Sequence, residues 1–268
     1  MEPSGHPHAR SPGLVTGASS GIGKAFAAQL AAEGRDLVLV ARRREQLAAL
    51  AKQLGESFQV RVEPMPADLT RPEDLRRVEE RLQRAPVVDL LVNSAGFGTG
   101  QPFLEVDPDR IESEIRLNAL ATIRLVRAVL PGMVSRGRGA IINVSSAMGF
   151  QGNPFFANYG ATKAYLTNVT QALADEYRGS GVRFQALCPG PVLTEFGEVA
   201  GIDDGGFPAF TVLRPEQVVK TSLRALAKGR EICVPGVAMR TTAWITARLP
   251  SRISRLFYRE FGKHFYLG

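Results

Sequence analysis

The stretch "TGASSGIG", residues 16–23, decides the fold, because its three glycines join an apolar segment directly to a helical one. The preceding "GLVTGA" (13–18) is typical of a buried strand, and "GIGKAFAAQLAAEG" (21–34) is typical of a helix that ends at a glycine. Glycines at such a junction permit a tight turn and let a diphosphate approach the amides at the helix N-terminus. The stretch therefore predicts a dinucleotide-binding turn, with a plain glycine-rich connection as the alternative.

The spacing of the glycines in this turn is G-x-x-x-G-x-G, wider than the common G-x-G-x-x-G. Serine hydroxyls beside them add hydrogen-bond donors for phosphate oxygens. The candidate cofactor-binding residues of the turn are Gly17, Ser19, Ser20, Gly21, Ile22 and Gly23.

Outward from this turn, short apolar runs alternate with longer helical patterns along the chain. The expected strands are 13–18, 36–41, 58–65, 87–96, 139–146, 182–190 and 231–236. The expected helices are 21–34, 43–54, 72–83, 108–130, 158–178 and 215–229. This order predicts an α/β fold: a single Rossmann-type, doubly wound parallel sheet of about seven strands with helices on both faces. The longest irregular connection, 191–212, is typical of a lid or binding loop.

The chain of 268 residues is long enough for one large domain with a buried core, and no linker or repeat divides it. We expect a disordered leader over 1–11, a Rossmann domain over 12–236 and a basic, amphipathic helical extension over 237–268. The leader has no apolar stretch typical of a signal peptide, and no apolar run reaches the roughly 18 to 20 residues of a membrane span. A cytoplasmic protein is therefore expected, and the two lone cysteines are expected to be buried thiols.

The net charge of +7 is concentrated near the C-terminus. Between Arg240 and His264 six basic residues accompany one acidic residue, so the rest of the chain is nearly neutral, which argues against a nucleic-acid-binding protein. Apolar residues recur through this tail with approximately helical spacing. Three roles remain open for it: covering a substrate pocket, forming a subunit interface, or contacting anionic lipid at a membrane surface. The first two are favoured, because such a stripe more often packs against protein.

The end of the second expected strand, "LVLVARRRE", indicates which nucleotide is bound. An acidic residue there would bond the adenosine ribose and repel a 2′-phosphate, but Ala41 stands at that position. Arg42, Arg43 and Arg44 follow, and guanidinium groups suit a phosphate. We therefore predict NADP(H), with Arg42 and Arg43 as binding residues. A solvated basic helix start is the alternative, which the unfavourable placement of cations at a helix N-terminus weakens.

Two later strand ends add weaker signals. In "ADLT" (67–70), Asp68 with Leu69 is a candidate for contacting the adenine, and capping the helix after Thr70 is an almost equal alternative for Asp68. "NSAG" (93–96) ends the fourth strand with small residues, which lets a cofactor lie against the backbone. Its candidate binding residues are Asn93, Ala95 and Gly96.

The stretch "NYGATKAY" (158–165) places Tyr159 four residues before Lys163, on one face of the expected helix. Most such pairs are ordinary neighbours on a helix surface. The pair alone therefore cannot distinguish a proton-transfer device from a coincidence of spacing.

Together these motifs resemble the short-chain dehydrogenase/reductase family in order and spacing, over about residues 12–236. The matching segments are TGASSGIG, Asp68-Leu69, NSAG, Asn118 in "RLNAL", Ser146 in "NVSS", Tyr159-x-x-x-Lys163 and "PGPVLT" (189–194). The chain is most similar in character to carbonyl and 3-oxoacyl reductases. The phrase "VLPGMVSRGRGAIINVSS" and the basic tail resemble microsomal fatty-acyl and steroid ketoreductases.

The resemblance implies a catalytic role for four residues. Tyr159 would be the general acid for ketone reduction, and Lys163 would favour its phenolate and bond the nicotinamide ribose. Ser146 would polarise the substrate oxygen, with Ser145 as the competing choice. Asn118 would hold a water that links Lys163 to solvent, or would be an amide satisfied by helix packing.

The residues after the sixth strand are expected to contact the nicotinamide end of the cofactor. They are Pro189, Gly190, Val192 and Thr194. No metal is expected, because hydride would come from the cofactor and the proton from Tyr159.

The sequence thus predicts an NADP(H)-dependent oxidoreductase that acts on a ketone, an aldehyde or a secondary alcohol, with an apolar carbonyl compound as its small-molecule substrate. The alternative is a non-catalytic NADP(H)-binding sensor or scaffold that keeps the fold. By resemblance we expect a homodimer or homotetramer formed through the long helices 108–130 and 158–178.

Overall fold

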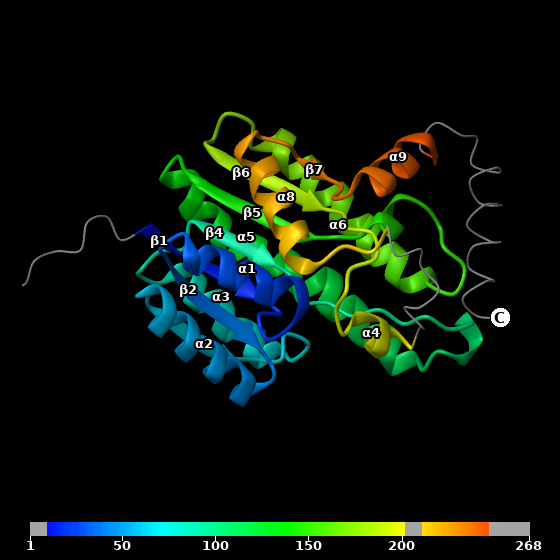
Figure 1. Cartoon of the computed structure of the whole chain (residues 1–268), viewed down its shortest axis with the longest axis horizontal. Coiled ribbons are helices and arrows are strands. Elements are labelled where there is room, and N and C mark those ends of the chain that lie inside the picture. The colour runs from blue at the N-terminus through cyan, green and yellow to red at the C-terminus, as the bar shows by residue number, and fades with distance from the viewer. Residues whose placement is uncertain (1–9, 202–210, 247–268) are drawn as a thin grey trace, which may run out of the picture.

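The computed structural model describes residues 10–201 and 211–246, which form a seven-stranded sheet flanked by helices (Figure 1). The strands are β1 (Arg10–Thr16), β2 (Arg35–Ala41), β3 (Val62–Pro66), β4 (Leu90–Asn93), β5 (Gly139–Val144), β6 (Val182–Leu187) and β7 (Ile232–Cys233). The α-helices are α1 (Gly21–Ala32), α2 (Arg44–Phe58), α3 (Pro72–Gln83), α4 (Pro108–Ile115), α5 (Thr122–Ser135), α6 (Ala157–Glu176), α7 (Phe196–Ala200), α8 (Pro215–Ala227) and α9 (Val237–Thr246). Two 3₁₀ turns, η1 (Phe103–Glu105) and η3 (Ala147–Phe150), and one π-helical turn, η2 (Arg116–Ala121), complete the described elements.

The sheet has the strand order β3-β2-β1-β4-β5-β6-β7, and every paired strand runs parallel to its neighbour. The chain builds outward from β1 to β3, then returns to β4 and builds in the other direction. The point where this order reverses, between β1 and β4, is where open α/β sheets bind ligands. The predicted fold class, a doubly wound parallel sheet, is therefore confirmed.

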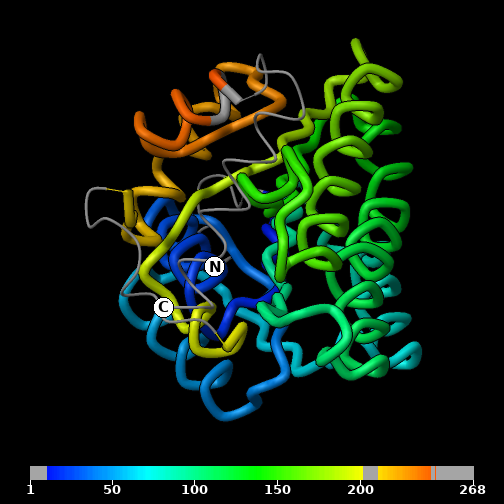
Figure 2. The backbone as a smooth tube through the Cα atoms, turned by 90° about the vertical axis from the view of Figure 1, so that its right-hand side faces the viewer, coloured from blue at the N-terminus to red at the C-terminus, as the bar shows by residue number. Residues whose placement is uncertain are grey.

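Successive strand residues point to opposite faces of the sheet, so a separate core forms on each face. Val15 and Leu39 pack on the face covered by α1, α2 and α8. Leu14 and Val40, their neighbours along the strands, pack on the face covered by α3, α5 and α6. Figure 2, viewed from the end where α4 and α9 lie, shows α5 and α6 (green) on one side and α1 and α2 (blue) on the other.

Several boundaries differ from those expected. Strand β1 begins at Arg10, so the expected leader over 1–11 is too long by at least two residues; residues 1–9 lie outside the described part. Helix α2 continues to Phe58 and ends where Gln59 adopts a left-handed backbone, with φ of 54°. The strand expected over 58–65 consequently starts only at Val62.

Helix α5 runs through Pro131 to Ser135, although we expected it to end at Pro131-Gly132. A proline inside a helix removes one hydrogen bond. The extra turn buries Met133 completely against the sheet, and this packing offsets that loss. The segment 191–212, expected to be irregular, contains the short helix α7.

One helical run, Pro108–Ser135, is long and apolar enough by composition to cross a membrane, with a mean hydropathy of 1.4 in its most apolar window. We had expected no run of this kind. Half of that window is buried inside the fold, as in the core helix of a globular domain. Within residues 10–201 and 211–246 no other helix meets the same criterion.

The extension expected over 237–268 begins with α9. Most of its apolar stripe and basic residues, from 247 onward, lie outside the described residues. The two cysteines, Cys188 and Cys233, are buried free thiols, as expected.

Candidate active site

A cavity of about 540 Å³ opens at the carboxyl ends of the central strands, next to the point where the strand order reverses. Most of the predicted site residues line it. They are Gly17, Ser19, Ser20, Gly21, Ile22, Gly23, Arg42, Arg43, Asp68, Leu69, Ala95, Gly96, Ser146, Tyr159, Lys163, Pro189, Gly190, Val192 and Thr194. Segments far apart in the sequence therefore converge on one site. Asn93 and Asn118 are the two predicted residues that do not line the cavity.

The glycine turn fits a nucleotide because its backbone is packed too closely for side chains. Gly17 has a φ of +65°, and a Cβ there would lie 2.9 Å from the backbone of Ala95. A Cβ on Gly23 would lie 2.3 Å from the carbonyl oxygen of Gly17. The backbone of the turn therefore packs directly against α1 and the end of β4, and it lines the cavity without intervening side chains.

Replacing Gly23 by Ala is expected to destabilise the fold by about 3 kcal/mol, the upper end of the usual cost of overpacking, because the contact is with backbone atoms. Urea denaturation followed by circular dichroism measures this change. Gly152→Ala is the matched control, since nothing lies within 4 Å of a Cβ at that position. A Gly23→Ala protein as stable as the parent would contradict the assignment of a rigid turn.

At the other end of the cavity the surface is cationic. Ala41 ends β2 and lines the cavity with Arg42 and Arg43, while Arg44 does not line it. The Arg43 side chain bridges two segments: Nε donates to Ser19 Oγ at 3.3 Å, and Nη1 lies 2.9 Å from Glu195 Oε2. A guanidinium at this position, with no acidic residue at the strand end, suits a phosphate group.

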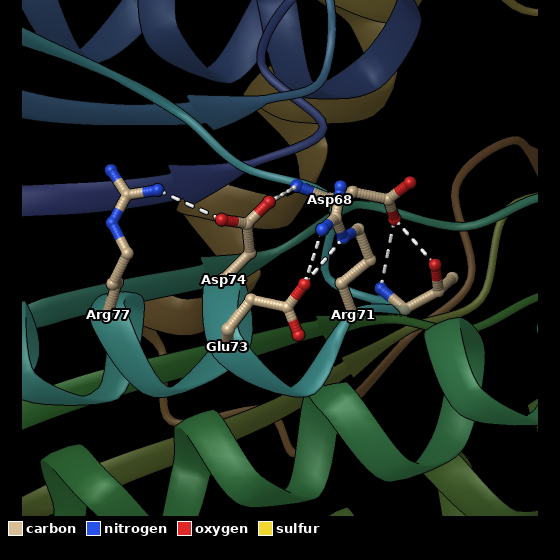
Figure 3. Close-up of polar contacts among 6 residues, drawn as sticks. Asp68, Arg71, Glu73, Asp74 and Arg77 are labelled. Carbon is tan, nitrogen blue, oxygen red and sulfur yellow. Dashed lines mark hydrogen bonds and ion pairs between the residues drawn. The ribbon is translucent and has the colours of Figure 1, made fainter.

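Asp68 forms hydrogen bonds within the loop that follows β3 (Figure 3). Its Oδ1 accepts hydrogen bonds from the backbone N–H of Thr70 at 3.0 Å and from the Thr70 hydroxyl at 2.7 Å, and its own N–H donates to Asp74 at 2.8 Å. The side chain thus stabilises the turn before α3, whose N-cap is Arg71. Asp68 therefore does not cap α3, because the N-cap Arg71 has no side-chain cap hydrogen bond. Asp68 does line the cavity, and its contact with the adenine stays a prediction.

Asn93 is not placed as the sequence suggested. It is buried at the end of β4, and its Nδ2 donates to Asn143 Oδ1 on the neighbouring strand at 2.9 Å. Asn143 in turn donates to Thr170 on α6 at 2.9 Å. Asn93 therefore ties β4 to β5 and α6 from within the sheet, and the neighbouring Ser94 faces the cavity instead.

The two serines after β5 point to different partners. Ser145 Oγ donates to the backbone carbonyl of Lys163 at 2.7 Å and lies 2.8 Å from Thr167 Oγ1, so it anchors α6. Ser146 accepts from Met148 N at 3.1 Å, and its hydroxyl interacts with that of Tyr159. Of the two, Ser146 is the one next to Tyr159.

Tyr159 and Lys163 are both buried, and their environment shifts both pKa values. Burial raises the pKa of Tyr159 well above its ordinary value, the Ser146 hydroxyl opposes this rise, and Glu114 adds to it. Burial lowers the pKa of Lys163 to about 8. Lys163 Nζ donates to Val144 O at 2.8 Å and lies 5.5 Å from the centre of the Tyr159 ring.

The expected lowering of the Tyr159 pKa by Lys163 is therefore not seen. The cost of placing a phenolate in a buried site outweighs the hydrogen bond from Ser146, and the charge of Glu114 adds to that cost. The ring of Tyr159 is held against Phe196, with centroids 5.3 Å apart, and against Phe156, at 6.1 Å. Tyr159 consequently keeps its proton at neutral pH in a fixed orientation.

Asn118 lies in the π-helical turn η2, an irregularity that is frequent at functional sites and that the sequence did not reveal. Its amide bonds the backbone of Phe97 and Thr162 Oγ1, all within 3.2 Å. A Cβ on Gly96 would lie 2.9 Å from Asn118 Oδ1 and 3.4 Å from Lys163 Nζ. Gly96 therefore packs closely against both groups, with no room for a side chain.

Sequence reasoning missed three residues of the site. Glu195 reaches Arg43 from the loop after β6. Met239 on α9 lines the cavity and covers Gly190, whose Cβ would lie 2.5 Å from its side chain. Glu114 on α4 is completely buried and influences Tyr159 and Lys163. Glu195 had a signal, since it falls in the segment 191–212 that we expected to be a binding loop. Met239 also had one, since it falls in the extension 237–268, for which covering a substrate pocket was one of the favoured roles.

A doubly wound sheet whose glycine turn shares one cavity with a buried Ser, Tyr and Lys defines a Rossmann-type oxidoreductase. More narrowly, the chain belongs to the short-chain dehydrogenase/reductase family, because residues 13–204 match the family model described as short chain dehydrogenase.

Individual relatives agree with this assignment. The chain is 32% identical to a bovine very-long-chain 3-oxoacyl-CoA reductase over 251 residues, which covers 89% of this chain and 75% of the relative. A short-chain dehydrogenase from Sphingobium yanoikuyae, solved with NADPH, is 40% identical with a TM-score of 0.82 over 88% of this chain and 93% of that one. A bulky-bulky ketone specific alcohol dehydrogenase from Comamonas testosteroni is 31% identical with a TM-score of 0.79, over 90% and 93%.

Proposed function

We propose that this protein is an NADP(H)-dependent reductase of bulky, apolar ketones. The observation that carries the proposal is one continuous cavity with Ser146 and Tyr159 in one part and Arg42 and Arg43 beside the neutral Ala41 in another. A single bound nucleotide could therefore reach both. The solved relative that holds NADPH, and a second with bound NADP, support the choice of nucleotide.

The residues that would hold the nucleotide are those of the glycine turn, the two arginines, and the backbone around Gly190 and Val192. When bound, the nucleotide supplies the hydride. Ser146 would then orient and polarise the carbonyl oxygen of the substrate, and Tyr159 would donate a proton to that oxygen. The raised pKa of Tyr159 suits this role, because it keeps the hydroxyl protonated until a negative charge develops on the substrate.

Lys163 would act on Tyr159 rather than on the substrate. Its ammonium is fixed by the carbonyl of Val144, and its pKa of about 8 lies near neutrality. A group with such a pKa can both give up and regain a proton at physiological pH. Lys163 is therefore suited to return a proton to Tyr159 after each reduction.

The walls of the cavity support an apolar substrate. Met148, Phe196 and Met239 line it close to the proposed catalytic residues. Val199 on α7 also lines the cavity and is 49% exposed, as expected for a side chain that an apolar ligand would cover. Relatives named for 3-oxoacyl-CoA and for bulky ketones fit the same chemistry.

The test is NADPH oxidation, followed by the absorbance of the reduced nicotinamide, with aryl ketones of increasing bulk and 3-oxoacyl thioesters of increasing chain length. We expect kcat/KM to rise with apolar size until the cavity is filled. If NADPH binds but no carbonyl compound is reduced, the protein is instead the non-catalytic nucleotide-binding protein considered from the sequence.

We also propose that the protein is a homo-oligomer. Ile115, Leu120 and Tyr165 are large side chains, each 43–44% exposed, on the adjacent elements α4, η2 and α6. Sedimentation velocity should give a dimer or tetramer, and Leu120→Glu should shift the population toward the monomer because it places a charge in the contact. A monomeric parent at micromolar concentration would contradict this.

A further inference from the structure

Glu114, the last acidic residue of α4, is a buried carboxylate outside the residues assigned above. Its side chain is 0% exposed. Neither carboxylate oxygen makes a hydrogen bond of standard geometry within residues 10–201 and 211–246. The Thr99 hydroxyl and the Asn158 amide lie close enough to stabilise the charged form, yet burial dominates and raises the pKa of Glu114. A buried acid with so few partners calls for an explanation, because burying an uncompensated carboxylate is costly.

The charged and titratable groups around Glu114 belong to two helices. Arg110, one turn earlier on α4, and Lys163 on α6 both favour the carboxylate. Tyr159 on α6 also senses Glu114, which raises the pKa of its hydroxyl. The Arg110 guanidinium is committed elsewhere, since it donates to Thr99 Oγ1 and to Val199 O, each at 2.9 Å. Lys163 is therefore the cation with which Glu114 can exchange a proton.

Buried polar groups lie near both Glu114 and Lys163. Asn118 lies one helical turn beyond Glu114, and its amide donates to Thr162, the residue next to Lys163. Asn118 Oδ1 and Lys163 Nζ both lie close to Gly96, 2.9 and 3.4 Å from the position that a Cβ would take there. Asn118, Thr162 and Lys163 are all buried, so Glu114 adjoins a buried region of polar side chains.

A route leads from Glu114 outward. A small cavity of about 20 Å³ is lined by Thr99 and Asn158, the two side chains beside Glu114, together with Gln101 and Ile111. About 10 to 15 Å³ suffices to hold one water molecule. A water there would have Thr99, Gln101 and Asn158 as hydrogen-bond partners. Glu114 does not itself line this cavity, so a proton from that water would reach the carboxylate through the Thr99 hydroxyl beside it.

Resting on the proposed function, we propose that Glu114 is a positioning residue that acts through Lys163, as the relay that restores the lysine's proton after each reduction. Tyr159 loses its O–H proton to the substrate oxygen, and the Lys163 ammonium returns a proton to the phenolate. The carboxylic acid of Glu114 then protonates the neutral amine, and the resulting carboxylate takes a proton from water. One proton is consumed for each carbonyl reduced, and no electrons move in the relay.

The test compares Glu114→Gln with Glu112→Gln, a control on the same helix whose side chain is 59% exposed and paired with Arg116. With NADPH and a bulky aryl ketone, Glu114→Gln should lower kcat roughly tenfold, less than the loss of a direct proton donor. The loss should grow as pH rises above the lysine's pKa, and the solvent deuterium isotope effect on kcat should increase. Glu114→Asp, which keeps the acid, should restore the parent's pH profile at least in part.

A purely structural role would lower kcat equally at every pH, leave the isotope effect unchanged and not distinguish Asp from Gln; that result would overturn the proposal. A second measurement needs no substrate, so it tests the relay independently of the proposed ketone reduction. In ¹⁵N-lysine-labelled protein, the Lys163 Nζ resonance should titrate at lower pH in Glu114→Gln, because the carboxylate no longer favours the ammonium. If no ketone is reduced, the proposed function fails while this shift still reports the coupling; an unchanged titration overturns the relay.

The carboxyl group of Glu114 should also make the stability of the folded protein depend on pH. Its pKa is raised in the folded state, so the folded protein binds the proton more tightly than the unfolded chain does. Protonated Glu114 therefore stabilises the folded state fully below the ordinary carboxyl pKa of 4.5. This contribution to the free energy of unfolding is lost as pH rises through the raised pKa of the folded state. Glu114→Gln should be as stable as the parent at pH 4 and more stable at pH 8, measured by thermal unfolding. A parent that gains relative stability with rising pH would contradict a carboxyl with a raised pKa.

Discussion

Replacing Tyr159 by Phe is expected to lower kcat for ketone reduction by ~10²–10⁴-fold, the usual contribution of a positioned proton donor. The change removes one hydroxyl from a ring that is held by Phe156 and Phe196, so the packing should persist. The affinity for NADPH should stay the same, because the glycine turn and the arginines are untouched. Steady-state kinetics with a bulky aryl ketone, together with a fluorescence titration of NADPH, measure both quantities.

Tyr165→Phe is the matched control for this experiment. Tyr165 lies on the same helix but is 44% exposed and has no part in the cavity, so its hydroxyl should be dispensable. A Tyr159→Phe enzyme with the parental kcat would show that another group protonates the substrate. Equal losses in both variants would instead point to a general effect on α6.

Replacing Arg43 by Ala is expected to raise the Kd for NADPH by ~10- to 100-fold, the range of a hydrogen bond to a charged group. The guanidinium lies in the cavity at the end of β2, where Ala41 stands in place of an acidic residue, and it contacts Ser19 and Glu195. The Kd for NADH, which lacks the 2′-phosphate, should change little. Isothermal titration calorimetry with both nucleotides gives the ratio of the two constants.

Arg44→Ala controls for the loss of a positive charge at this end of α2. Arg44 begins the helix but does not line the cavity, so its removal should affect both nucleotides slightly and equally. If Arg43→Ala weakened NADH as much as NADPH, Arg43 would be holding the fold of the loop through Glu195 rather than reading the phosphate. The preference for NADP(H) would then have to rest on Arg42.

Much of the site could be predicted because its residues sit at strand ends. In a parallel sheet the carboxyl ends of the strands meet at one edge, so motifs that follow separate strands must converge there. This is why Gly17, Ala41 and Ser146 line one cavity although more than a hundred residues separate the first from the last. Asn93 does not line the cavity because it is the last residue of β4 and its side chain contacts Asn143 inside the sheet; its role in cofactor binding stays a prediction.

Contacts between helices and strands that are distant in the sequence could not be predicted from local sequence patterns. Helix α5 continues through Pro131 because Met133 is buried beneath it, which local propensity does not report. Met239 reaches Gly190 because the chain returns across the cavity after β7. In the sequence, Glu114 is one of several acidic residues in a polar helical segment. The residues next to it do not distinguish it from Glu112, which is exposed.

The sequence alone therefore determined the doubly wound parallel sheet, the family and the identity of the Ser, Tyr and Lys, because each depends on local patterns: apolar periodicity, glycines at turns and fixed spacing along a helix. The tertiary structure alone decided the electrostatic state of those residues. Burial raises the pKa of Tyr159, lowers that of Lys163 to about 8 and places Glu114 beside both. These effects depend on how much water and charge surround a group, which is set by distant segments packing together and not by its neighbours in sequence.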